Sequence, residues 1–261
     1  MLATAADRDP GLAGLLLADD GDFAHAGHPC LAYLRRRLPD GLGACRIVPV
    51  AALLAETNGG LVIEELAGPE PVPAFFRRYL DLVFGLAVRL FVRYGIALES
   101  HQQNAAVVAG PGPSLRLLVK DFDGALINHS RLADALGSGA PEPAGFGDQR
   151  LLTASDDALA DVFITITVHL CAGAIAFGLA DHGYAPLPRL LATVREALAA
   201  ALDRLCGEPT ARLLRARLLE AGRLPVKAML TAGTLTGKDR TGARDINKFY
   251  GPPGPNYLRP R

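Results

Sequence analysis

The stretch that decides the fold is bounded by two polar segments, which read Glu99-Ser-His-Gln-Gln-Asn104 and Lys120-Asp-Phe-Asp-Gly124. Between them lie two β-prone runs, residues 105–109 and 114–119, joined by Gly110-Pro-Gly-Pro113. Two such runs on either side of a Gly/Pro connection predict a β-hairpin. The hairpin would bring both polar segments to its open end.

The expected register pairs Ala109 with Ser114, and counting back from there sets Asn104 opposite Val119 and Gln102 opposite Asp121. The polar groups of the two segments, His101 among them, would then meet at the open end of the hairpin. Mg²⁺ prefers carboxylate and carbonyl oxygens together with nucleotide phosphates. A histidine can donate to a phosphate oxygen or act as an acid or base near neutral pH. An acid, an amide and an imidazole at one end of a rigid hairpin therefore predict a metal–nucleotide site.

Each of these residues also has an ordinary structural explanation. Asn104 and Asp121 are residue types that favour strand ends and turns. His101 can be a capping residue, and Lys120 can form a surface ion pair with Asp121. Asp123-Gly124 is a turn signal, so we expect Asp123 to be structural.

The bulk composition excludes one class of function. The 261 residues carry 27 basic and 27 acidic side chains, so the formal net charge is zero. A nucleic-acid binder needs a basic excess or stripe, and we expect no nucleic-acid partner. Arg35-Arg36-Arg37 follows an apolar turn of a predicted helix and is interpreted as its solvated face. The four cysteines form no Cys-x-x-Cys pair and fit the reduced thiols of a cytoplasmic protein.

One apolar segment is long enough to cross a membrane, because residues 162–180 carry no formal charge. The segment contains Thr165, Thr167 and His169, and no Lys or Arg adjoins either end, whereas membrane spans carry such residues on the cytoplasmic side. We predict a buried central helix of a soluble protein without a membrane partner. His169 is then a core histidine whose hydrogen bonds are satisfied. The N-terminus lacks the basic-then-apolar layout of a signal peptide.

Turn residues and periodicity outline the first part of the chain. Residues 1–28 are small, acidic and punctuated by glycine, and we expect a loosely packed lead-in before a domain of residues 29–261. A short helix is expected over residues 29–38. Residues 46–50 and 60–65 are predicted strands.

Helices are expected to dominate the rest. From Pro71, apolar side chains recur at i+3 and i+4 as far as Phe91, which predicts a long helix ending near Gly95. Further helices are expected over residues 131–136, after a cap at Ser155, and over residues 188–205 and 209–221. The predicted fold class is α+β, with a small antiparallel sheet and its hairpin packed on a mostly helical C-terminal bundle.

The two polar segments have a loosely kinase-like spacing. In protein kinases a His-containing loop supplies an Asn, and the following strand supplies the Asp of Asp-Phe-Gly, both to magnesium. Here His101-Gln-Gln-Asn104 and Asp121-Phe-Asp-Gly124 imitate that order, but the kinase catalytic Asp does not follow His101 and no Gly-x-Gly-x-x-Gly loop precedes it. The analogy supports nucleotide and metal binding more than phosphorylation of a hydroxyl group.

The run Tyr94-Gly-Ile-Ala-Leu-Glu-Ser-His-Gln-Gln-Asn104 closely resembles a signature of the NRPS-independent siderophore synthetases, the IucA/IucC family. In that family a Tyr-Gly-Ile-x-Leu-Glu-x-His-x-Gln-Asn run is followed by a strand and an Arg-Asp-Phe-x-Gly element. Residues 120–124 match this element, with Lys120 in place of the arginine. The resemblance covers residues from about Pro71 to the end and implies a palm-like C-terminal half.

The resemblance implies an ATP-dependent ligase, which adenylates a citrate-type carboxylate and passes the acyl group to an amine or alcohol in siderophore biosynthesis. ATP and Mg²⁺ are the implied cofactors. His101 would contact the ATP phosphates as the catalytic residue, and Asn104 and Asp121 would hold the metal. The implied ATP-binding residues are Glu99, His101, Gln103, Asn104, Lys120 and Asp121.

The sequence also departs from the family pattern. Family synthetases are longer chains, whose N-terminal half carries a His-Pro-rich motif and a phosphate-gripping Ser/Thr/Arg segment. Gly27-His28-Pro29 is only a fragment of the first, and the tail residues Lys238, Arg240 and Arg244 do not replace the second. We therefore expect the chain to be incomplete without a complementary N-terminal half. A homo-oligomer is also expected. The alternatives are a non-catalytic accessory or dimerisation module of the family and a kinase-like phosphotransferase.

The C-terminal region is also related to ferric-siderophore reductases of the FhuF type, which hold a [2Fe–2S] cluster with a C-terminal cysteine array. Such a cluster needs four thiolates that converge on it. The cysteines of this chain are scattered at positions 30, 45, 171 and 206, and reductase activity is not expected.

Overall fold

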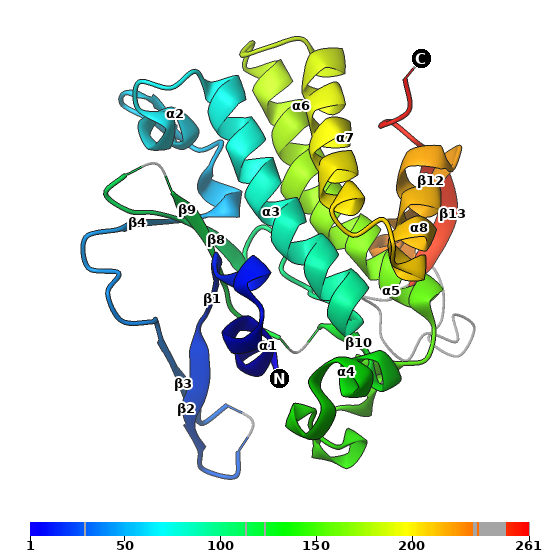
Figure 1. The fold of residues 1–261 in the computed structure, drawn as a ribbon. Coiled ribbons are helices and arrows are strands. Elements are labelled where there is room, and N and C mark those ends of the chain that lie inside the picture. The colour runs from blue at the N-terminus through cyan, green and yellow to red at the C-terminus, as the bar shows by residue number, and fades with distance from the viewer. Residues whose placement is uncertain (29, 113, 123, 232–233, 235–248, 261) are drawn as a thin grey trace.

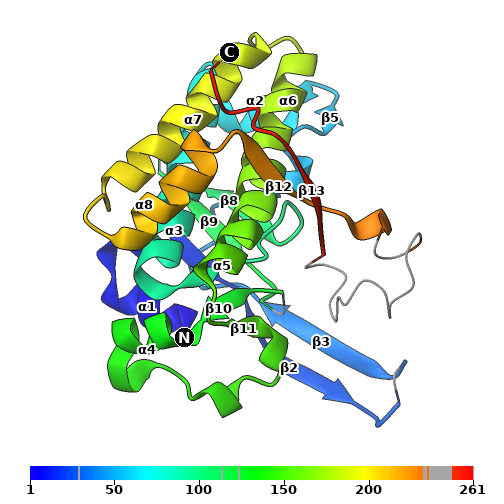
Figure 2. The ribbon, with the colours of Figure 1, turned by 90° about the vertical axis from the view of Figure 1, so that its right-hand side faces the viewer.

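The structure is a computed structural model that describes residues 1–28, 30–112, 114–122, 124–231, 234 and 249–260. Long helices pack together beside a small sheet, and two further strand pairs extend from this body (Figures 1 and 2). The predicted mixture of a small sheet and a helical bundle is confirmed in this coarse form.

The central sheet has four strands in the order β1–β9–β8–β4. β8 and β9 form the predicted hairpin, β4 pairs antiparallel with β8, and β1 lies parallel to β9. The strands span Leu15–Leu17 (β1), Arg46–Pro49 (β4), Ala105–Ala109 (β8) and Leu115–Val119 (β9).

The remaining strands form small sheets. A three-stranded sheet has the order β11–β10–β7, and the pairs β2–β3, β5–β6 and β12–β13 are each two-stranded. Their bounds are Asp19–His25 (β2), Ala32–Arg37 (β3), Glu56–Thr57 (β5), Gly60–Leu61 (β6), Ile96–Ala97 (β7), Leu126–Asn128 (β10), Leu152–Thr153 (β11), Arg223–Lys227 (β12) and Tyr250–Pro255 (β13).

The helices predicted from Pro71 onward agree with the observed ones to within a few residues, whereas α1 and α2 were not predicted. α5 and α6 are joined by a π-helical segment, Phe163–Gly173, and a second π-helical turn, Ala216–Glu220, extends α8. The bounds are Leu2–Arg8 (α1), Val62–Ala67 (α2), Val72–Tyr94 (α3), His129–Leu136 (α4), Asp156–Val162 (α5), Ala174–Asp181 (α6), Leu187–Asp203 (α7) and Pro209–Arg215 (α8).

α3 is the centre of the hydrophobic core. Its apolar face packs against α7, the π-helical segment and β9, and Phe75, Phe84 and Phe91 are fully buried. The helix ends at Gly95, which has φ 64° and donates its N–H to the carbonyls at 90 and 91. Glycine adopts this left-handed conformation without a Cβ penalty, so the predicted end of the helix is confirmed.

The apolar helix Asp156–Asp181 is the one described helix that is long and apolar enough to cross a membrane, and 72% of its most apolar window is buried in the protein. Ser155 caps it by accepting the N–H of Ala158 at 3.2 Å. The His169 ring nitrogens lie 2.8 Å from the Tyr257 hydroxyl and 3.0 Å from the Pro225 carbonyl. The predictions of a buried central helix and a satisfied core histidine are confirmed.

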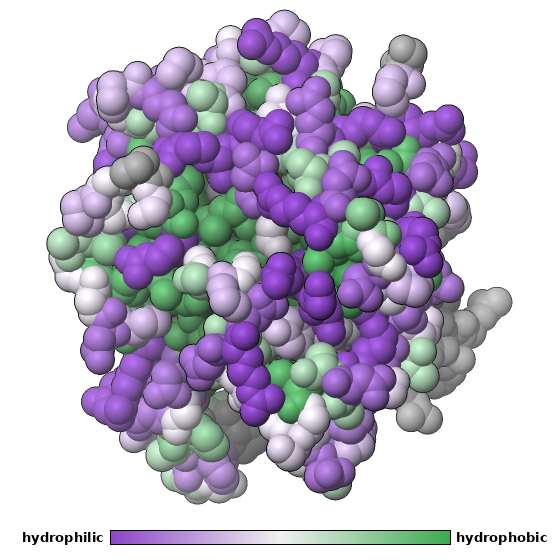
Figure 3. Space-filling view, viewed as in Figure 1, coloured by the Kyte–Doolittle hydropathy of each residue, from purple (hydrophilic) through white to green (hydrophobic). Residues whose placement is uncertain are grey.

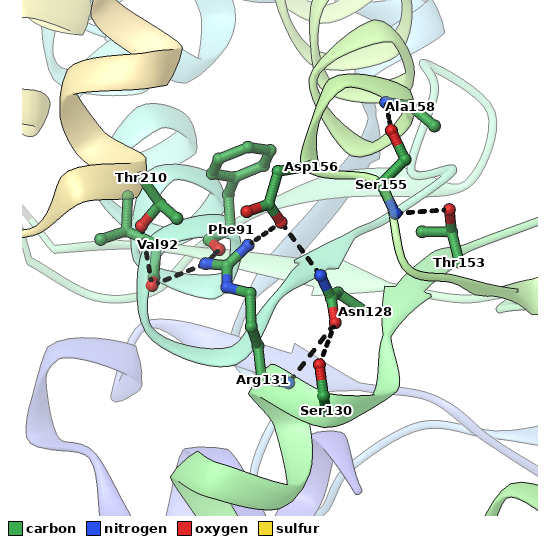
Figure 4. A network of polar contacts seen from close by, with 10 residues as sticks. All are labelled: Phe91, Val92, Asn128, Ser130, Arg131, Thr153, Ser155, Asp156, Ala158 and Thr210. Carbon is green, nitrogen blue, oxygen red and sulfur yellow. Dashed lines mark hydrogen bonds and ion pairs between the residues drawn. The ribbon is translucent and has the colours of Figure 1, made fainter.

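Arg131 joins three helix ends (Figure 4). Its guanidinium donates to the carbonyls of Phe91 and Val92 at 2.5 and 2.8 Å, near the C-terminal end of α3, where a positive charge is favourable. It also pairs with Asp156 in the first turn of α5 at 2.6 Å. Asn128, the last residue of β10 and the cap of α4, donates to the same carboxylate at 3.2 Å, so the start of α4 is tied to both helices.

The first residues contribute to the core, although a loosely packed lead-in was expected over residues 1–28. Ala5 and Leu12 are completely buried, and β1 is an edge strand of the central sheet. Asp9 is buried and accepts hydrogen bonds from Arg89 at 2.6 Å and from the Tyr94 hydroxyl at 3.1 Å. The segment up to β1 is therefore held against α3.

Two predicted elements are wrong. Residues 29–38 were expected to form a helix, but residues 32–37 form β3, which pairs with β2 in an exposed ribbon. Arg35-Arg36-Arg37 therefore belongs to a strand and not to a helix face. Residues 60–65 were expected to form one strand, but only Gly60–Leu61 is extended, and α2 follows because Glu64 accepts the Leu61 N–H at 2.7 Å.

The surface in the view of Figure 1 is mainly hydrophilic, and hydrophobic residues gather over the four-stranded sheet (Figure 3). A second, smaller cluster of buried apolar residues lies apart from the main core and is contributed largely by strands of this sheet and their flanks. Its members are Ala18, Leu42, Val108 and Leu118. The sheet is therefore buried on one face by the main core and partly on the other.

Candidate functional site

The hairpin brings the two polar segments together, with a register one residue away from the expected one. Ala109 pairs with Leu115 and not with Ser114, because the connection has five residues instead of four. Asn104 consequently lies opposite Lys120, whose N–H donates to the Asn104 carbonyl at 2.9 Å. The juxtaposition is confirmed and the register is corrected. A shift of one residue reverses which side chains share a face of the sheet.

The first segment is a tight turn closed by its own backbone. The His101 carbonyl accepts the N–H of Asn104 at 2.8 Å and that of Ala105 at 3.0 Å. The His101 Nδ1 accepts the Gln103 N–H at 3.3 Å. In a neutral imidazole the proton then resides on Nε2, so His101 presents an N–H donor on the other side of its ring. The Gln103 side chain is exposed, and Asn104 is buried.

Glu99 connects the two segments. Its carboxylate pairs with the Lys227 ammonium at 3.0 Å, and each side chain is only 14% exposed. The same carboxylate lies against Gly124, where an added Cβ would overlap it and would lie 2.5 Å from the Glu99 Cδ. Any larger residue at 124 would displace the Glu99 side chain, so the glycine of the second segment accommodates the acid of the first.

Asp121 has an unusual backbone and a basic neighbour. Its φ of 86° makes it the one non-glycine residue with positive φ in the part of the chain that the structure describes. Its carboxylate lies 3.9 Å from the Arg36 guanidinium, which also pairs with Asp20 at 2.5 Å. The Asp20 carboxylate raises the pKa of Arg36 above its ordinary value, so this group stays charged.

Sequence reasoning missed two of these basic residues. Arg36 was interpreted as part of a solvated helix face, and Lys227 belongs to a segment that was singled out only for its resemblance to the family. Both reach the site from strands that are distant in sequence, β3 and β12. No local pattern in the sequence marks either residue, because each reaches the site only through the tertiary placement of its strand.

The donor set fits a metal that is shared with phosphate. Asn104 and Asp121 supply one amide and one carboxylate that is 41% exposed. Within the described residues no group of three or more His, Cys, Asp or Glu side chains lies together as a metal site. Mg²⁺ commonly takes one or two carboxylates with waters and substrate phosphates, so these two residues suit a nucleotide-borne ion and do not suit a metal held by protein alone.

The cysteines do not converge. Cys30 and Cys206 are exposed, whereas Cys171 is buried and its thiol donates to the Ser100 carbonyl at 3.2 Å. Burial raises the pKa of the Cys171 thiol to about 12. Cys45 lies 3.3 Å from the Arg116 guanidinium. The scatter of the cysteines predicted from the sequence is found in the structure.

Solved structures with the same fold are proteins of siderophore biosynthesis. The petrobactin biosynthesis protein AsbB of Bacillus anthracis matches with a TM-score of 0.75 at 18% identity, over 98% of this chain and 45% of AsbB. Aerobactin synthetase IucC of Klebsiella pneumoniae matches with a TM-score of 0.72 at 17% identity, over 98% of this chain and 46% of IucC. ATP-bound aerobactin synthetase IucA of the same organism matches with a TM-score of 0.64 at 14% identity, over 100% of this chain and 46% of IucA. This chain spans less than half the length of these proteins and shares their fold.

Residues 73–242 match the model of the family described as ferric iron reductase FhuF-like transporter, and the chain belongs to this family. The siderophore biosynthesis protein RhbC of Rhizobium meliloti is 36% identical over 86 residues, which are 30% of this chain and 15% of RhbC. Staphyloferrin A synthase of Staphylococcus aureus is 36% identical over 59 residues, 23% of this chain and 10% of the synthase. The predicted relationship to siderophore synthetases, with an FhuF-like region, is confirmed.

Proposed function

We infer that this chain is the ATP- and magnesium-binding part of an ATP-dependent siderophore synthetase. In this proposal the chain takes part in the adenylation of a citrate-type carboxylate and in the condensation of that carboxylate with an amine or alcohol. Both reactions take place in the cytoplasm. The observation that carries the proposal is the meeting of the two polar segments, closed by the contact of Glu99 with Gly124. The ATP bound to IucA, a protein of the same fold, supports the choice of nucleotide.

The residues present suit the charge of a triphosphate. The His101 Nε2–H is a donor for a phosphate oxygen, and two basic residues, Lys120 and Arg36, adjoin Asn104 and Asp121. Bound magnesium would neutralise phosphate charge during attack at the α-phosphate. Asn104 and Asp121 would hold that ion through their side-chain oxygens. Glu99 and Lys227 neutralise each other beside Gly124.

The ligase proposal is preferred to the alternatives on chemical grounds. A cluster-bearing reductase needs converging thiolates, and the four cysteines of this chain lie apart. A kinase-like phosphotransferase needs a catalytic Asp after His101, which the sequence does not have. Because the chain spans less than half of its solved relatives, we propose that turnover requires a complementary N-terminal half.

The first test is calorimetric titration of the protein with Mg-ATP. We expect Asp121→Asn and His101→Ala each to weaken binding at least about tenfold, the value of one charge-assisted hydrogen bond. Asp181→Asn and His182→Ala, two exposed residues at the end of α6, are matched controls and should bind like the wild type. Equal affinity of the two site variants and the controls would place the nucleotide elsewhere.

A second test follows turnover after the complementary half is added. Release of AMP and pyrophosphate with a citrate-type acid and an amine marks the ligase. Transfer of labelled γ-phosphate to a small acceptor would instead mark a phosphotransferase. A folded wild-type protein that binds no Mg-ATP at millimolar nucleotide would favour the non-catalytic module.

A further inference from the structure

The turn that carries His101 is bonded to parts of the protein that lie outside the two polar segments. The side-chain amide of Gln102 donates to the Leu170 carbonyl at 2.6 Å. The backbone carbonyl of Gln102 accepts the N–H of Ala51, in the short turn that follows β4, at 3.0 Å. The residue directly after His101 is therefore held through both its side chain and its backbone.

The Leu170 carbonyl can accept this hydrogen bond because it lies in the π-helical segment Phe163–Gly173. In an α-helix this carbonyl would accept the N–H of Ala174, four residues further along the chain. The Ala174 N–H donates instead to the His169 carbonyl, five residues before it. A backbone carbonyl that loses its helical donor needs another partner, and the Gln102 amide is that partner. π-Helical turns are frequent at functional sites.

The next residue of the π-helical segment makes a second connection to the turn. The Cys171 thiol donates to the Ser100 carbonyl at 3.2 Å, and the Cys171 carbonyl accepts the Tyr79 hydroxyl of α3 at 2.7 Å. Ser100 and Gln102 are the two chain neighbours of His101. Both neighbours are thus bonded to consecutive residues of one helix, which is itself fixed to the core.

Apolar packing alone does not fix the turn, because a small cavity lies next to it. The cavity has a volume of about 20 Å³, which is room for one water molecule. Its walls include Leu98, Ser100 and Ala105 on the side of the turn, and Thr167 and Cys171 on the side of the π-helical segment. The position of the turn therefore depends on its polar contacts.

We propose that Gln102 is a positioning residue of the nucleotide site, which holds His101 in place by bonding its turn to the π-helical segment. This inference rests on the proposed function, in which the His101 imidazole meets the ATP phosphates. Gln102 acts through His101 and not by contact with the nucleotide. A functional donor must be held within about 0.5 Å of its working position, and a loosened turn would misplace the Nε2–H of His101.

The test removes the donor while it keeps the length and the charge of the side chain. Gln102→Met does this, and Gln149→Met is the matched control. The Gln149 amide also donates to backbone carbonyls, those of Pro143 and Phe146, at 2.9 and 3.0 Å. Circular dichroism should show that both variants are folded. In calorimetry, Gln102→Met should lose about three- to tenfold in Mg-ATP affinity, whereas Gln149→Met should bind like the wild type.

Two further measurements separate positioning from a general loss of structure. In a His101→Ala background, Gln102→Met should weaken Mg-ATP binding by less than about twofold, because the residue through which it acts is absent. In NMR of the histidine ring nitrogens, wild-type His101 should show one tautomer with the proton on Nε2, since its Nδ1 accepts the Gln103 N–H. Gln102→Met should shift this signal toward a mixture of tautomers and leave the His169 signal unchanged.

Two results would overturn the proposal. One is an equal loss of Mg-ATP affinity with and without His101. The other is a Gln102→Met variant that has wild-type affinity and an unchanged His101 signal. A wild-type protein that binds no Mg-ATP, but whose His101 signal shifts in Gln102→Met, would refute the proposed function and support the positioning role.

Discussion

The contact between Glu99 and Gly124 makes Gly124→Ala a sharp test of how the site is built. The φ of Gly124 lies outside the left-handed region, so alanine meets no backbone penalty there. Its methyl group would, however, overlap the Glu99 carboxylate and lie 2.9 Å from the Glu99 Cβ. The carboxylate must therefore move, and its 3.0 Å bond to Lys227 is lost.

The expected loss of stability follows from the separation of Glu99 and Lys227. Glu99 and Lys227 are each 14% exposed, so their pairing is only weakly screened by solvent. A hydrogen bond between charged groups contributes about 1.5–3 kcal/mol. Replacing glycine by alanine at a compatible position stabilises the protein by about 0.4–1 kcal/mol, because it lowers the conformational entropy of the unfolded chain. We expect Gly124→Ala to lower the free energy of unfolding by about 1–2 kcal/mol.

The assay is a double-mutant cycle by urea unfolding. In a Glu99→Ala background the carboxylate is absent, and Gly124→Ala should cost nothing or stabilise the protein slightly, which gives a coupling energy of about 2 kcal/mol. Gly145→Ala is the control, because an added Cβ there meets nothing within 4 Å. An equal cost of Gly124→Ala with and without Glu99 would refute the contact as the reason for this glycine.

Two further predictions concern stability and pH. Burial raises the pKa of Asp9, but hydrogen bonds from Arg89, Gly11 and Tyr94 outweigh burial and place the pKa below its ordinary value of 3.8. The stability that the charged Asp9 contributes to the folded protein is therefore present above pH 3.8 and is lost as the pH falls through the lowered pKa. Asp9→Asn should therefore lower the free energy of unfolding, measured with urea at pH 7, by about 3 kcal/mol. The variant should also lose less stability in acid than the wild type, and an unchanged acid transition would contradict this. Burial lowers the pKa of His169, with partial compensation by the Pro225 carbonyl. The folded protein should lose stability as the pH falls below about 6.5, the pKa of the unfolded chain; thermal unfolding of His169→Gln should lack this slope, and an identical slope in the variant would assign it to another group.

Most long elements of the fold could be predicted because their signals are local. The i+3 and i+4 periodicity of α3 and the turn residues around the β8–β9 hairpin lie within the elements that they specify. The helix predicted over residues 29–38 failed because Leu31, Leu34 and Leu38 have helical spacing, whereas the ribbon exposes all three side chains. A periodic pattern indicates a helix only when one face is buried, and burial is decided by the rest of the chain.

The meeting of the two polar segments was predictable from the sequence, but its geometry was not. His101, Asn104 and Asp121 could be assembled from two motifs and a hairpin, although the length of the connection displaced the register by one residue. Arg36 and Lys227 could not be assigned from local patterns, because they reach the site from β3 and β12 through tertiary pairing. Their assignment requires the positions of strands that lie far apart in sequence.

The backbone of Asp121 gives the strongest physical reason to regard the site as functional. A non-glycine residue at φ 86° carries a conformational cost of about 1–3 kcal/mol. Its contact with Arg36 at 3.9 Å, with 41% of the aspartate side chain exposed, is worth less than about 1 kcal/mol and does not offset that cost. The Lys120 N–H is bonded to the Asn104 carbonyl at 2.9 Å, so the hairpin fixes the residue that precedes Asp121. An uncompensated backbone cost at a partly exposed carboxylate is the observation that supports our proposal of Asp121 as a metal ligand.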